Sequence, residues 1–318
     1  MPFVLPFLIS FFLTLALTPL LIKLAASCHA VDLPNERKIH LNPIPRWGGI
    51  GLFLGILGGV VFAFVYSHAF HQDLIRHHLK DLAGISGAAL TMLIVGILDD
   101  LNPIPAKRKL FWQIVAAFWL ILFGVKIGFV DFPSEQKIIY LPFFISVLLS
   151  LFWIVGITNA LNLLDGLDGL LSGISTISAL ALFVIALEKG YLFPAFFLIA
   201  MSGATLAFLY YNFNPAKIFL GDSGSLFLGI LWASLTIVGT LKTSATTVFV
   251  PLLILGLPIL DTSMAIFRRF GKGENIFKPD KEHLHHRLLN WGLSQKKAVL
   301  ILYGITGVLA ASAFFLSR

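Results

Sequence analysis

The chain has 318 residues, of which 58% are hydrophobic and only 12% are charged. Soluble domains carry about 25% charged residues, so this composition is typical of an integral membrane protein and excludes an ordinary soluble domain. A single cysteine, Cys28, excludes disulfides and multi-cysteine zinc or iron–sulfur sites within one chain. We expect the net charge of +7 to reflect basic residues held on the cytoplasmic side of a membrane, without nucleic-acid binding.

Ten stretches of the chain are long and apolar enough to cross a membrane. A spanning helix needs about 20 mostly apolar residues. The sequence therefore predicts an all-α integral membrane protein with about ten transmembrane helices, and a single polytopic domain over residues 1–318. The predicted spans cover residues 3–23, 47–66, 82–98, 110–128, 138–157, 170–187, 191–211, 225–241, 246–267 and 298–316.

The basic residues divide unevenly between the loops on the two sides of this arrangement. With ten spans, sixteen of the 23 Lys and Arg residues fall on one side and seven on the other. Short cytoplasmic loops are enriched in Lys and Arg, so the richer side is predicted to be cytoplasmic and both termini to lie outside. The cytoplasmic loops then cover about residues 24–46, 99–109, 158–169, 212–224 and 268–297.

The first of these loops combines basic residues with a Pro-Arg-Trp-Gly-Gly turn at residues 45–49. Arg37, Lys38 and Arg46 are candidates for binding a phosphate group, because their charges are held close to the membrane surface. Basic residues in such a loop also serve to anchor the chain on the cytoplasmic side. The sequence is compatible with either role.

Two adjacent carboxylates, Asp99 and Asp100, end the third apolar segment. Carboxylates at a helix C-terminus oppose the helix dipole, and two of them ~5 Å apart repel by about 3 kcal/mol at an effective dielectric of roughly 20. Compensation is expected from Mg²⁺, from a shared proton, or from the basic cluster at residues 107–109. The alternative is a solvated turn where the chain leaves the membrane.

A run of polar residues at a constant spacing of three lies in the next cytoplasmic loop. Asn159, Asn162, Asp165 and Asp168 occupy it, and Gly166 with its neighbours favours a loop or a broken helix. Amide and carboxylate oxygens can converge there on a hard cation or on the hydroxyls of a sugar. A polar capping loop between two spans is the simpler interpretation.

Asp222 lies in a Gly-Asp-Ser-Gly sequence directly before another apolar segment. Small and polar residues at a helix start leave free backbone N–H groups, which favour an N-cap and an anion site. A capping turn alone explains the same pattern. Phe219, just before this turn, is a candidate for stacking on a base, but taken alone it favours a lipid or core contact.

Two further features lie near the end of the chain. Asp261 falls inside a predicted span, where a lone acid is either functional or paired with a buried arginine or hydroxyl. The last cytoplasmic loop begins with basic residues and later carries three histidines within four positions. These favour a diphosphate ligand or proton transfer, against the alternative of a basic surface on acidic lipid. The residues concerned are Arg268, Arg269, His283, His285 and His286.

Taken in order along one membrane face, these motifs resemble the polyprenyl-phosphate N-acetylhexosamine-1-phosphate transferase family, of the glycosyltransferase 4 type. The resemblance runs from about Asn35 to Arg287 and is most specific at residues 159–169, 219–224 and 283–286. It implies ten transmembrane helices, a cytoplasmic active site in a bacterial inner membrane, and Mg²⁺ dependence with Mn²⁺ as a substitute. The implied reaction moves a sugar 1-phosphate from a UDP-sugar to a polyprenyl phosphate and releases UMP.

The resemblance also implies roles for single residues. Asp222 is similar to the family's magnesium ligand, with Asp100 as its partner, and Asp99 to the residue that activates or attacks a phosphate. Both a covalent intermediate on Asp99 and deprotonation of the lipid phosphate by Asp99 fit the sequence. The implied catalytic residues are Asp99, Asp100, His285 and His286, and the implied substrate-binding residues are Asn162, Asp165, Asp168, Phe219, Arg46, Arg268, Arg269 and His283.

The histidine motif favours one branch of this family. Enzymes that transfer phospho-N-acetylmuramoyl-pentapeptide carry three consecutive histidines, whereas Leu284 interrupts them here. The sequence is more similar to the branch that uses UDP-N-acetylglucosamine to start O-antigen, enterobacterial common antigen or wall teichoic acid, although related UDP-N-acetylhexosamine donors stay open. The expected partners are the donor, a polyprenyl phosphate, the lipid bilayer and a second copy in a homodimer.

A secondary transporter is the main alternative of another class. Its ionisable residues are expected near the middle of the membrane on discontinuous helices. Most of the acidic motifs here lie instead at one membrane face, which disfavours a transporter, while Asp261 inside a span is the feature that favours it.

Overall fold

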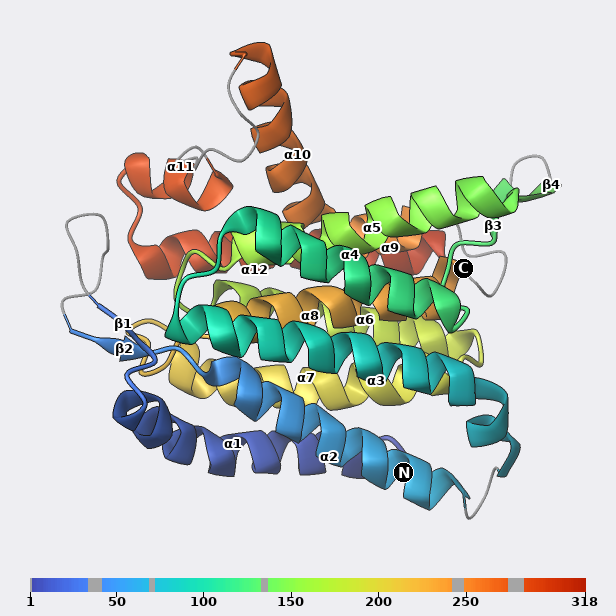
Figure 1. Cartoon of the computed structure of the whole chain (residues 1–318), viewed down its shortest axis with the longest axis horizontal. Coiled ribbons are helices and arrows are strands. Elements are labelled where there is room, and N and C mark those ends of the chain that lie inside the picture. Colours follow the sequence, from blue (N-terminus) through green and yellow to red (C-terminus); the bar gives the residue numbers. More distant parts are fainter. Residues whose placement is uncertain (1, 34–41, 69–71, 133–136, 242–248, 274–282) are drawn as a thin grey trace.

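The computed structural model describes residues 2–33, 42–68, 72–132, 137–241, 249–273 and 283–318. Long helices run side by side along one direction (Figure 1). In this part of the chain, eight helices are long and apolar enough to cross a membrane. They are α1 (Val4–Ser27), α2 (Gly48–His68), α3 (Gln72–Leu101), α5 (Phe143–Leu164), α6 (Leu170–Glu188), α7 (Leu192–Asn212), α8 (Gly221–Thr236), whose span continues through the following helical turn to Gly239, and α12 (Gln295–Leu316).

The other elements are short or leave the bundle. Five of them are helical, and the four strands form two antiparallel pairs, β1 with β2 and β3 with β4. α10 projects away from the parallel helices, and α11 lies beside it (Figure 1). These elements are β1 (Val31–Asp32), β2 (Ile44–Pro45), α4 (Ala106–Leu122), β3 (Phe129–Phe132), β4 (Lys137–Tyr140), the π-helix η1 (Ile237–Leu241), α9 (Phe249–Ile254), α10 (Gly256–Gly271) and α11 (Leu284–Asn290).

The helical membrane architecture predicted from the sequence is confirmed, while the number of ten spans stays a prediction. Each of the eight long apolar helices overlaps a predicted span. The predicted span at 110–128 corresponds to α4, which has only 17 residues. The predicted span at 246–267 is divided between α9 and α10, because the helix is interrupted at Leu255. That the chain forms one domain also stays a prediction.

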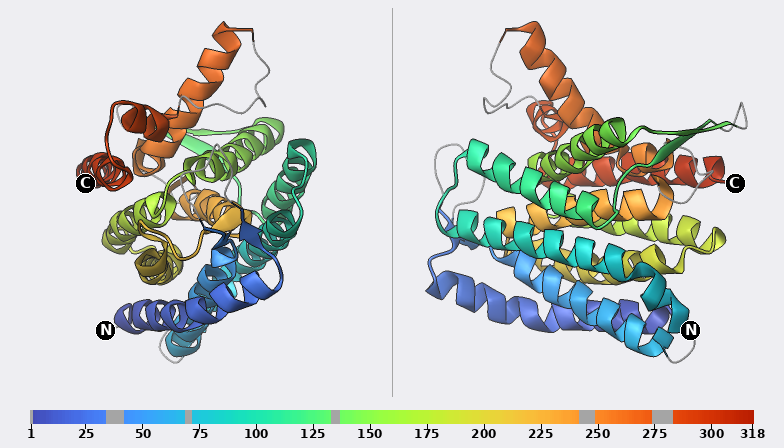
Figure 2. Two further views of the ribbon diagram at one scale, coloured as in Figure 1. Left: turned by 90° about the vertical axis from the view of Figure 1, so that its left-hand side faces the viewer. Right: turned by 45° about the vertical axis from the view of Figure 1, so that its right-hand side comes forward.

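Helix α8 runs through the middle of the bundle and packs against α2, α3 and α5 (Figure 2). Glycines on two neighbouring helices allow this close packing. A Cβ atom at Gly49 of α2 would overlap the backbone of Gly224, and one at Gly96 of α3 would overlap the backbone of Asp222 and Ser223. The start of α8 is therefore held tightly between the start of α2 and the end of α3.

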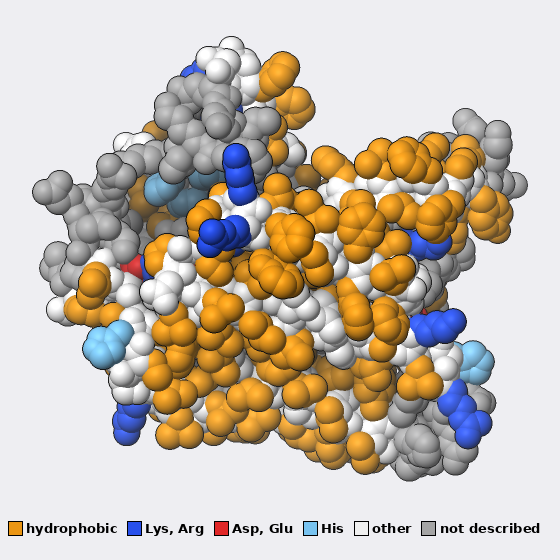
Figure 3. Space-filling view, in the orientation of Figure 1, with side chains coloured by type: hydrophobic (Ala, Val, Ile, Leu, Met, Phe, Trp, Pro, Cys, Tyr) orange, Lys and Arg blue, Asp and Glu red, His pale blue; other side chains and the backbone are white. Residues whose placement is uncertain are grey.

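Hydrophobic side chains cover the outer face of the bundle in a broad band, while Lys and Arg gather near its edges (Figure 3). The exposed side chains include large aromatic residues such as Phe111, Trp112 and Phe152. A wide apolar surface without charges is what a lipid-facing helix bundle requires. The structure therefore supports a multi-span membrane protein.

Both chain termini lie toward the same end of the bundle (Figure 2). The β1–β2 pair, the end of α3 and the start of α4 lie at the opposite end (Figure 1). The sequence motifs around residues 99, 165 and 222 are therefore gathered at one end of the parallel helices, away from the termini.

Candidate active site

A cavity of about 430 Å³ opens at this end of the bundle. Helices α3, α5 and α8 and the segments beside them supply much of its wall, and twelve of its nineteen lining residues are polar or charged. Eight of the residues singled out in the sequence line this cavity: Arg46, Asp100, Asn162, Asp165, Asp168, Phe219, Asp222 and His286.

Asp100 caps the N-terminus of α8 from the end of α3. Its Oδ1 accepts a hydrogen bond from the backbone N–H of Asp222 at 2.8 Å, and its Oδ2 accepts one from Ser223 at 3.1 Å. Gly221 precedes these residues with a φ of +68°, a conformation that glycine adopts without strain. The unfavourable placement of Asp100 at the end of α3 is thus offset by the positive end of a second helix.

Lys109 at the start of α4 lies between two carboxylates. Its Nζ atom is 2.7 Å from Asp222 Oδ2 and 3.3 Å from Asp99 Oδ2. The other oxygen of Asp99 accepts the backbone N–H of Ile104 at 2.6 Å. The sequence predicted that residues 107–109 could offset the negative charge of the acidic pair. Lys109 confirms this prediction for Asp99. Asp99 itself is not among the residues that line the cavity.

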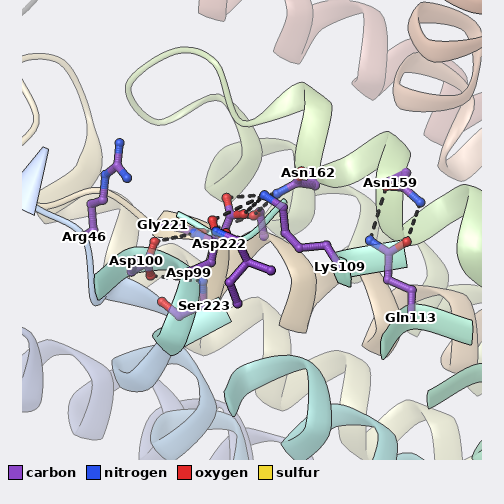
Figure 4. A network of polar contacts seen from close by, with 12 residues as sticks. Arg46, Asp99, Asp100, Lys109, Gln113, Asn159, Asn162, Gly221, Asp222 and Ser223 are labelled. Atoms are coloured by element: carbon purple, nitrogen blue, oxygen red, sulfur yellow. Dashed lines mark hydrogen bonds and ion pairs between the residues drawn. The ribbon is translucent and has the colours of Figure 1, made fainter. Parts of the chain in front are cut away.

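Asn162 on α5 completes the surroundings of Asp222 (Figure 4). Its Nδ2 atom donates to Asp222 Oδ1 at 3.2 Å and to Ser225 Oγ at 2.8 Å. The two oxygens of Asp222 are therefore held by donors from two different helices, α4 and α5. This arrangement fixes the carboxylate at the wall of the cavity.

Asp165 and Asp168 follow α5 and face the same cavity. Burial raises the pKa of Asp165 to about 8, and the negative charges of Asp222 and Asp100 add to the effect. Asp168 instead stabilises a loop, because its Oδ2 accepts the side-chain N–H of Asn214 at 2.9 Å and the backbone N–H of Ala216 at 3.0 Å. The cavity thus brings several carboxyl groups together in unlike surroundings.

The segment before α8 is joined to the turn between β2 and α2. Phe219 donates its backbone N–H to the carbonyl oxygen of Pro45 at 2.8 Å and accepts that of Gly48 at 3.1 Å. Arg46 between them forms an ion pair with Asp32. Both Arg46 and Phe219 line the cavity. The candidate phosphate-binding residues Arg37 and Lys38 lie outside the described residues.

The histidine segment is anchored by Asp261. The Oδ2 atom of Asp261 is 2.9 Å from His283 Nδ1, and its Oδ1 accepts the backbone N–H of Leu284 at 2.8 Å. Asp261 therefore has a buried partner, as one of the two sequence interpretations expected, but this partner is a histidine and not an arginine or hydroxyl. The contact joins α10 to the start of α11.

Only one of the three histidines reaches the cavity. His286 lines it, whereas His285 is 2% exposed and lies against Gly166, where a Cβ atom would overlap its ring. The rings of His283 and His285 are parallel, with centroids 5.7 Å apart. Burial lowers the pKa of His285 to about 4, and the neighbouring His286 contributes to the shift. His285 is therefore neutral at physiological pH.

Comparison with known proteins agrees with these features. The model of the glycosyl transferase family 4 matches residues 82–240. The chain is 38% identical over 314 residues to a probable undecaprenyl-phosphate N-acetylglucosaminyl 1-phosphate transferase of Bacillus subtilis, covering 98% of this chain and 84% of that protein. This chain belongs to glycosyl transferase family 4. The resemblance predicted from the motifs is thereby confirmed.

Other family 4 relatives have similar names. A decaprenyl-phosphate N-acetylglucosaminephosphotransferase of Mycobacterium tuberculosis is 36% identical over 325 residues, covering 92% of this chain and 78% of that protein. An undecaprenyl-phosphate alpha-N-acetylglucosaminyl 1-phosphate transferase of Escherichia coli is 29% identical over 300 residues, covering 91% of this chain and 77% of that protein. These names favour the N-acetylglucosamine branch over the pentapeptide branch and over a transporter.

Several predicted site residues of this family 4 protein lie outside the cavity wall. Besides Asp99 and His285, these are His283, Arg268 and Arg269. His283 is buried against Asp261, and the two arginines occupy the last turn of α10. Asn159, the first residue of the constant-spacing motif, faces Gln113 of α4 and not the cavity.

The oxygen-rich wall of this site suits a magnesium ion. Asp222, Asp100 and Asn162 offer the hard oxygen ligands that Mg²⁺ prefers. Within the described residues, no three His, Cys, Asp or Glu side chains form a group that holds a metal by themselves. This fits Mg²⁺, which usually binds through one or two carboxylates and completes its shell with water and phosphates.

Other polar residues at the family 4 site were not identified from the sequence. Asp32, Asn214, Ser225 and Gln295 line the cavity. Asn214 is a single polar residue in a loop and Gln295 is the first residue of α12, so neither belongs to a local motif. Asp32 precedes the basic loop and forms an ion pair with Arg46. An acidic residue next to a basic loop could have indicated this pairing from the sequence.

Proposed function

We propose that this chain transfers N-acetylglucosamine 1-phosphate from UDP-N-acetylglucosamine to undecaprenyl phosphate or another polyprenyl phosphate. A phosphate oxygen of the lipid attacks the phosphorus that carries the sugar, the bond from this phosphorus to the bridging oxygen breaks, and UMP leaves. The observation that carries the proposal is the cavity in which Asp100, Asn162, Asp165, Phe219 and Asp222 meet, in a chain of family 4.

The donor occupies the cavity with its base near Phe219. A half-buried aromatic ring in a polar wall offers one apolar face for stacking, while amide and carboxylate groups beside it accept and donate hydrogen bonds. Asn162 and Asp165 provide these groups for the nucleoside. Arg46 and His286, on other parts of the wall, are placed for the diphosphate.

Mg²⁺ is assigned to Asp222, with Asp100 as its partner. When bound, the ion neutralises charge on the diphosphate and polarises the phosphorus under attack. Mn²⁺, which also accepts oxygen ligands, is expected to substitute for it. The donor set supports this assignment, because every candidate ligand on this wall offers oxygen.

The residues of the chain contribute mainly by position and charge. Lys109 places an ammonium group beside Asp222 and Asp99, where it offsets part of the negative charge of these two carboxylates. Asp99 is held by Lys109 and by the N–H of Ile104. We assign Asp99 the role of base or nucleophile that family resemblance implies. Holding both substrates in line accounts for much of the rate enhancement.

The site is proposed to face the cytoplasm of a bacterial inner membrane, with both termini outside and ten spans in total. The excess of Lys and Arg in the loops around the cavity supports this orientation. The lipid tail then lies between lipid-facing helices, and a homodimer is the expected assembly. The product feeds a cell-envelope polysaccharide.

The test is UMP release by the purified protein with undecaprenyl phosphate, Mg²⁺ and one of two donors. We expect release with UDP-N-acetylglucosamine and none with UDP-N-acetylmuramoyl-pentapeptide. Release only with the pentapeptide donor would contradict the substrate while keeping the reaction. Release with neither donor, from folded protein, would contradict the proposed function.

A further inference from the structure

The side-chain amides of Gln113 on α4 and Asn159 on α5 hydrogen bond to each other in both directions (Figure 4). Gln113 Nε2 donates to Asn159 Oδ1 at 3.2 Å, and Asn159 Nδ2 donates to Gln113 Oε1 at 2.6 Å. Asn159 Nδ2 also donates to the carbonyl oxygen of Val155 at 2.8 Å. Gln113 is only 2% exposed. The pair is thus a partly buried polar link between two helices.

This link lies one helical turn from the two donors that hold Asp222. Gln113 follows Lys109 by four residues on α4, and Asn159 precedes Asn162 by three residues on α5. Residues at these spacings are neighbours on one helix surface. The helix faces that carry the amide pair are therefore also the faces that present Lys109 and Asn162 to Asp222.

Together these contacts connect α4 and α5 in two ways, through Asp222 and through the amide pair. Asp222 Oδ2 is held by Lys109 of α4 at 2.7 Å, and Asp222 Oδ1 is held by Asn162 of α5 at 3.2 Å. One turn further along, Gln113 and Asn159 join the same two helices directly. A sliding or rotation of α4 against α5 would break the amide pair and move both donors relative to Asp222.

Helix α4 is held to α3 by the ion pair of Lys109 with Asp99. It is also held there by Trp119, whose Nε1–H donates to the carbonyl oxygen of Ala83 at 3.3 Å. The amide pair supplies a directional contact of α4 with its other neighbour, α5.

Much of the surface of α4 is exposed apolar side chain, including Phe111, Trp112 and Phe118. Its buried face beyond Gln113 begins with Ala116 and Ala117, whose small side chains permit close approach but specify register weakly. In a membrane, association of apolar helices depends on packing and on hydrogen bonds between helices. A reciprocal amide pair supplies such a directional contact.

We propose that Gln113 and Asn159 are positioning residues of the transferase, which set the register of α4 against α5 and thereby aim Lys109 and Asn162 at Asp222. Neither side chain lines the cavity, so neither is expected to touch substrate. The inference rests on the proposed function, because the charge of Asp222 matters only if a diphosphate reacts beside it. Displacing catalytic groups by about 1 Å can lower a rate about 100-fold.

The test compares four changes in the full-length protein, using UMP release as the assay. These are Gln113→Ala, Asn159→Ala, the two combined, and the exchange of Gln113→Asn with Asn159→Gln, which keeps both amides. We expect each single alanine variant to lower kcat about tenfold or more, with KM for UDP-N-acetylglucosamine changed less than threefold. The combined variant should be no slower than the slower single variant, and the exchange should recover kcat to within about fivefold.

Thr176→Ala is the matched control for loss of a buried contact between helices. Thr176 of α6 donates to Thr205 of α7 at 2.8 Å, and both residues are buried away from Asp222. We expect this variant to lower the melting temperature at unchanged kcat. A loss of kcat in Thr176→Ala as large as in Gln113→Ala would overturn the positioning role, because any lost contact would then suffice.

Three further outcomes would overturn the inference. Wild-type kcat in both single alanine variants would mean that the amide pair does not position Lys109 and Asn162. Independent, multiplying losses in the combined variant, or no recovery in the exchange, would mean that the two residues do not act as a pair. Absence of UMP release from the wild-type protein would remove the proposed function and this role with it.

Discussion

At the scale of single residues, the site depends on carboxylates whose surroundings differ. Asp100 is bound by backbone N–H groups, Asp222 by two side-chain donors and Asp99 by one of each kind. Asp165 has a pKa raised to about 8, chiefly by burial. Neighbouring carboxylates in unlike surroundings are suited to unlike tasks in one reaction.

Replacing Asp222 by alanine is expected to remove Mg²⁺-dependent turnover. The change deletes the proposed metal ligand and leaves Lys109 and Asn162 without their common partner. We expect kcat to fall about 100-fold or more at every Mg²⁺ concentration, and binding of Mn²⁺ to the protein with UDP, followed by electron paramagnetic resonance, to weaken. Normal activity across a Mg²⁺ titration would contradict the assignment.

The Asp99→Asn variant tests the role of Asp99 in turnover separately from binding of UDP-N-acetylglucosamine. Asparagine keeps an oxygen for the N–H of Ile104 but removes the charge that faces Lys109. Loss of a general base or nucleophile should lower kcat about 1,000-fold. Binding of UDP-N-acetylglucosamine, measured by calorimetry, should stay within about threefold, since Asp99 does not line the cavity. Undiminished turnover would remove Asp99 from the mechanism.

His285 is expected to make stability depend on pH in the acidic range. Its pKa is about 4 in the folded protein, against a usual value of about 6.5 in an unfolded chain. Between these values the unfolded state binds more protons, so stability falls as pH drops from about 6.5 to 4 and is constant above 6.5. His285→Asn should reduce the fall in melting temperature between pH 7 and pH 5 by a few degrees.

His29→Asn is the control for that pH series, because His29 is exposed and asparagine tolerates its positive φ of 60°. The control should melt with the same dependence on pH as the wild-type protein. If His285→Asn and His29→Asn shift the melting curve alike, burial of His285 does not produce the dependence.

At the scale of elements, the site is built where α3 and the start of α8 touch. Asp100 on α3 caps α8, and Gly96 one turn earlier leaves space for the backbone of Asp222 and Ser223. Asp100 and Gly96 are four residues apart on α3, so they lie on the same helix face and contact α8 together. The position of Asp222 therefore depends on helix packing as well as on its own side-chain partners.

Gly96→Val tests this contact. Its side chain would overlap the α8 backbone, and such overpacking costs about 1–3 kcal/mol. We expect a melting temperature lower by several degrees and kcat lower about tenfold, because the start of α8 must move away from Asp100. Gly156→Ala on α5 is the control, since a Cβ atom there meets nothing within 4 Å. Equal effects of both substitutions would argue against the packing explanation.

At the scale of the whole molecule, the structure places both termini toward one end of the bundle (Figure 2). The residues that line the cavity, such as Asp100 and Asp222, lie at the opposite end. Cys28 lies just after α1, at the cavity end, and is exposed. It is the single cysteine of the sequence. The native chain therefore carries one chemical marker for the side of the membrane that the site faces.

Labelling of Cys28 with a membrane-impermeant maleimide should reveal the orientation. A cytoplasmic site predicts labelling in inverted vesicles and protection in intact spheroplasts, with complete labelling in both after detergent treatment. Cys28→Ser should abolish the signal. Labelling in intact spheroplasts would place the cavity outside and contradict the orientation predicted from the basic residues.

The sequence by itself determined the membrane class and the family, favoured one branch of that family, and identified eight of the nineteen residues that line the cavity. Apolar length defines a span without any tertiary contact, and motifs such as residues 219–224 carry their chemistry locally. That is why Asp100, Asn162, Asp165 and Asp222 were expected together and do line one cavity.

Only the tertiary structure decided which partner each of these groups has. Whether Asn159 faces the cavity or Gln113, which basic residue of 107–109 reaches Asp99, and which histidine meets Asp261 depend on how helices rotate against each other. Residues far apart in the chain, such as Gln113 and Asn159, become neighbours through packing, and no local spacing records that contact. Composition and motif spacing are local properties, whereas the register of one helix against another belongs to the folded chain.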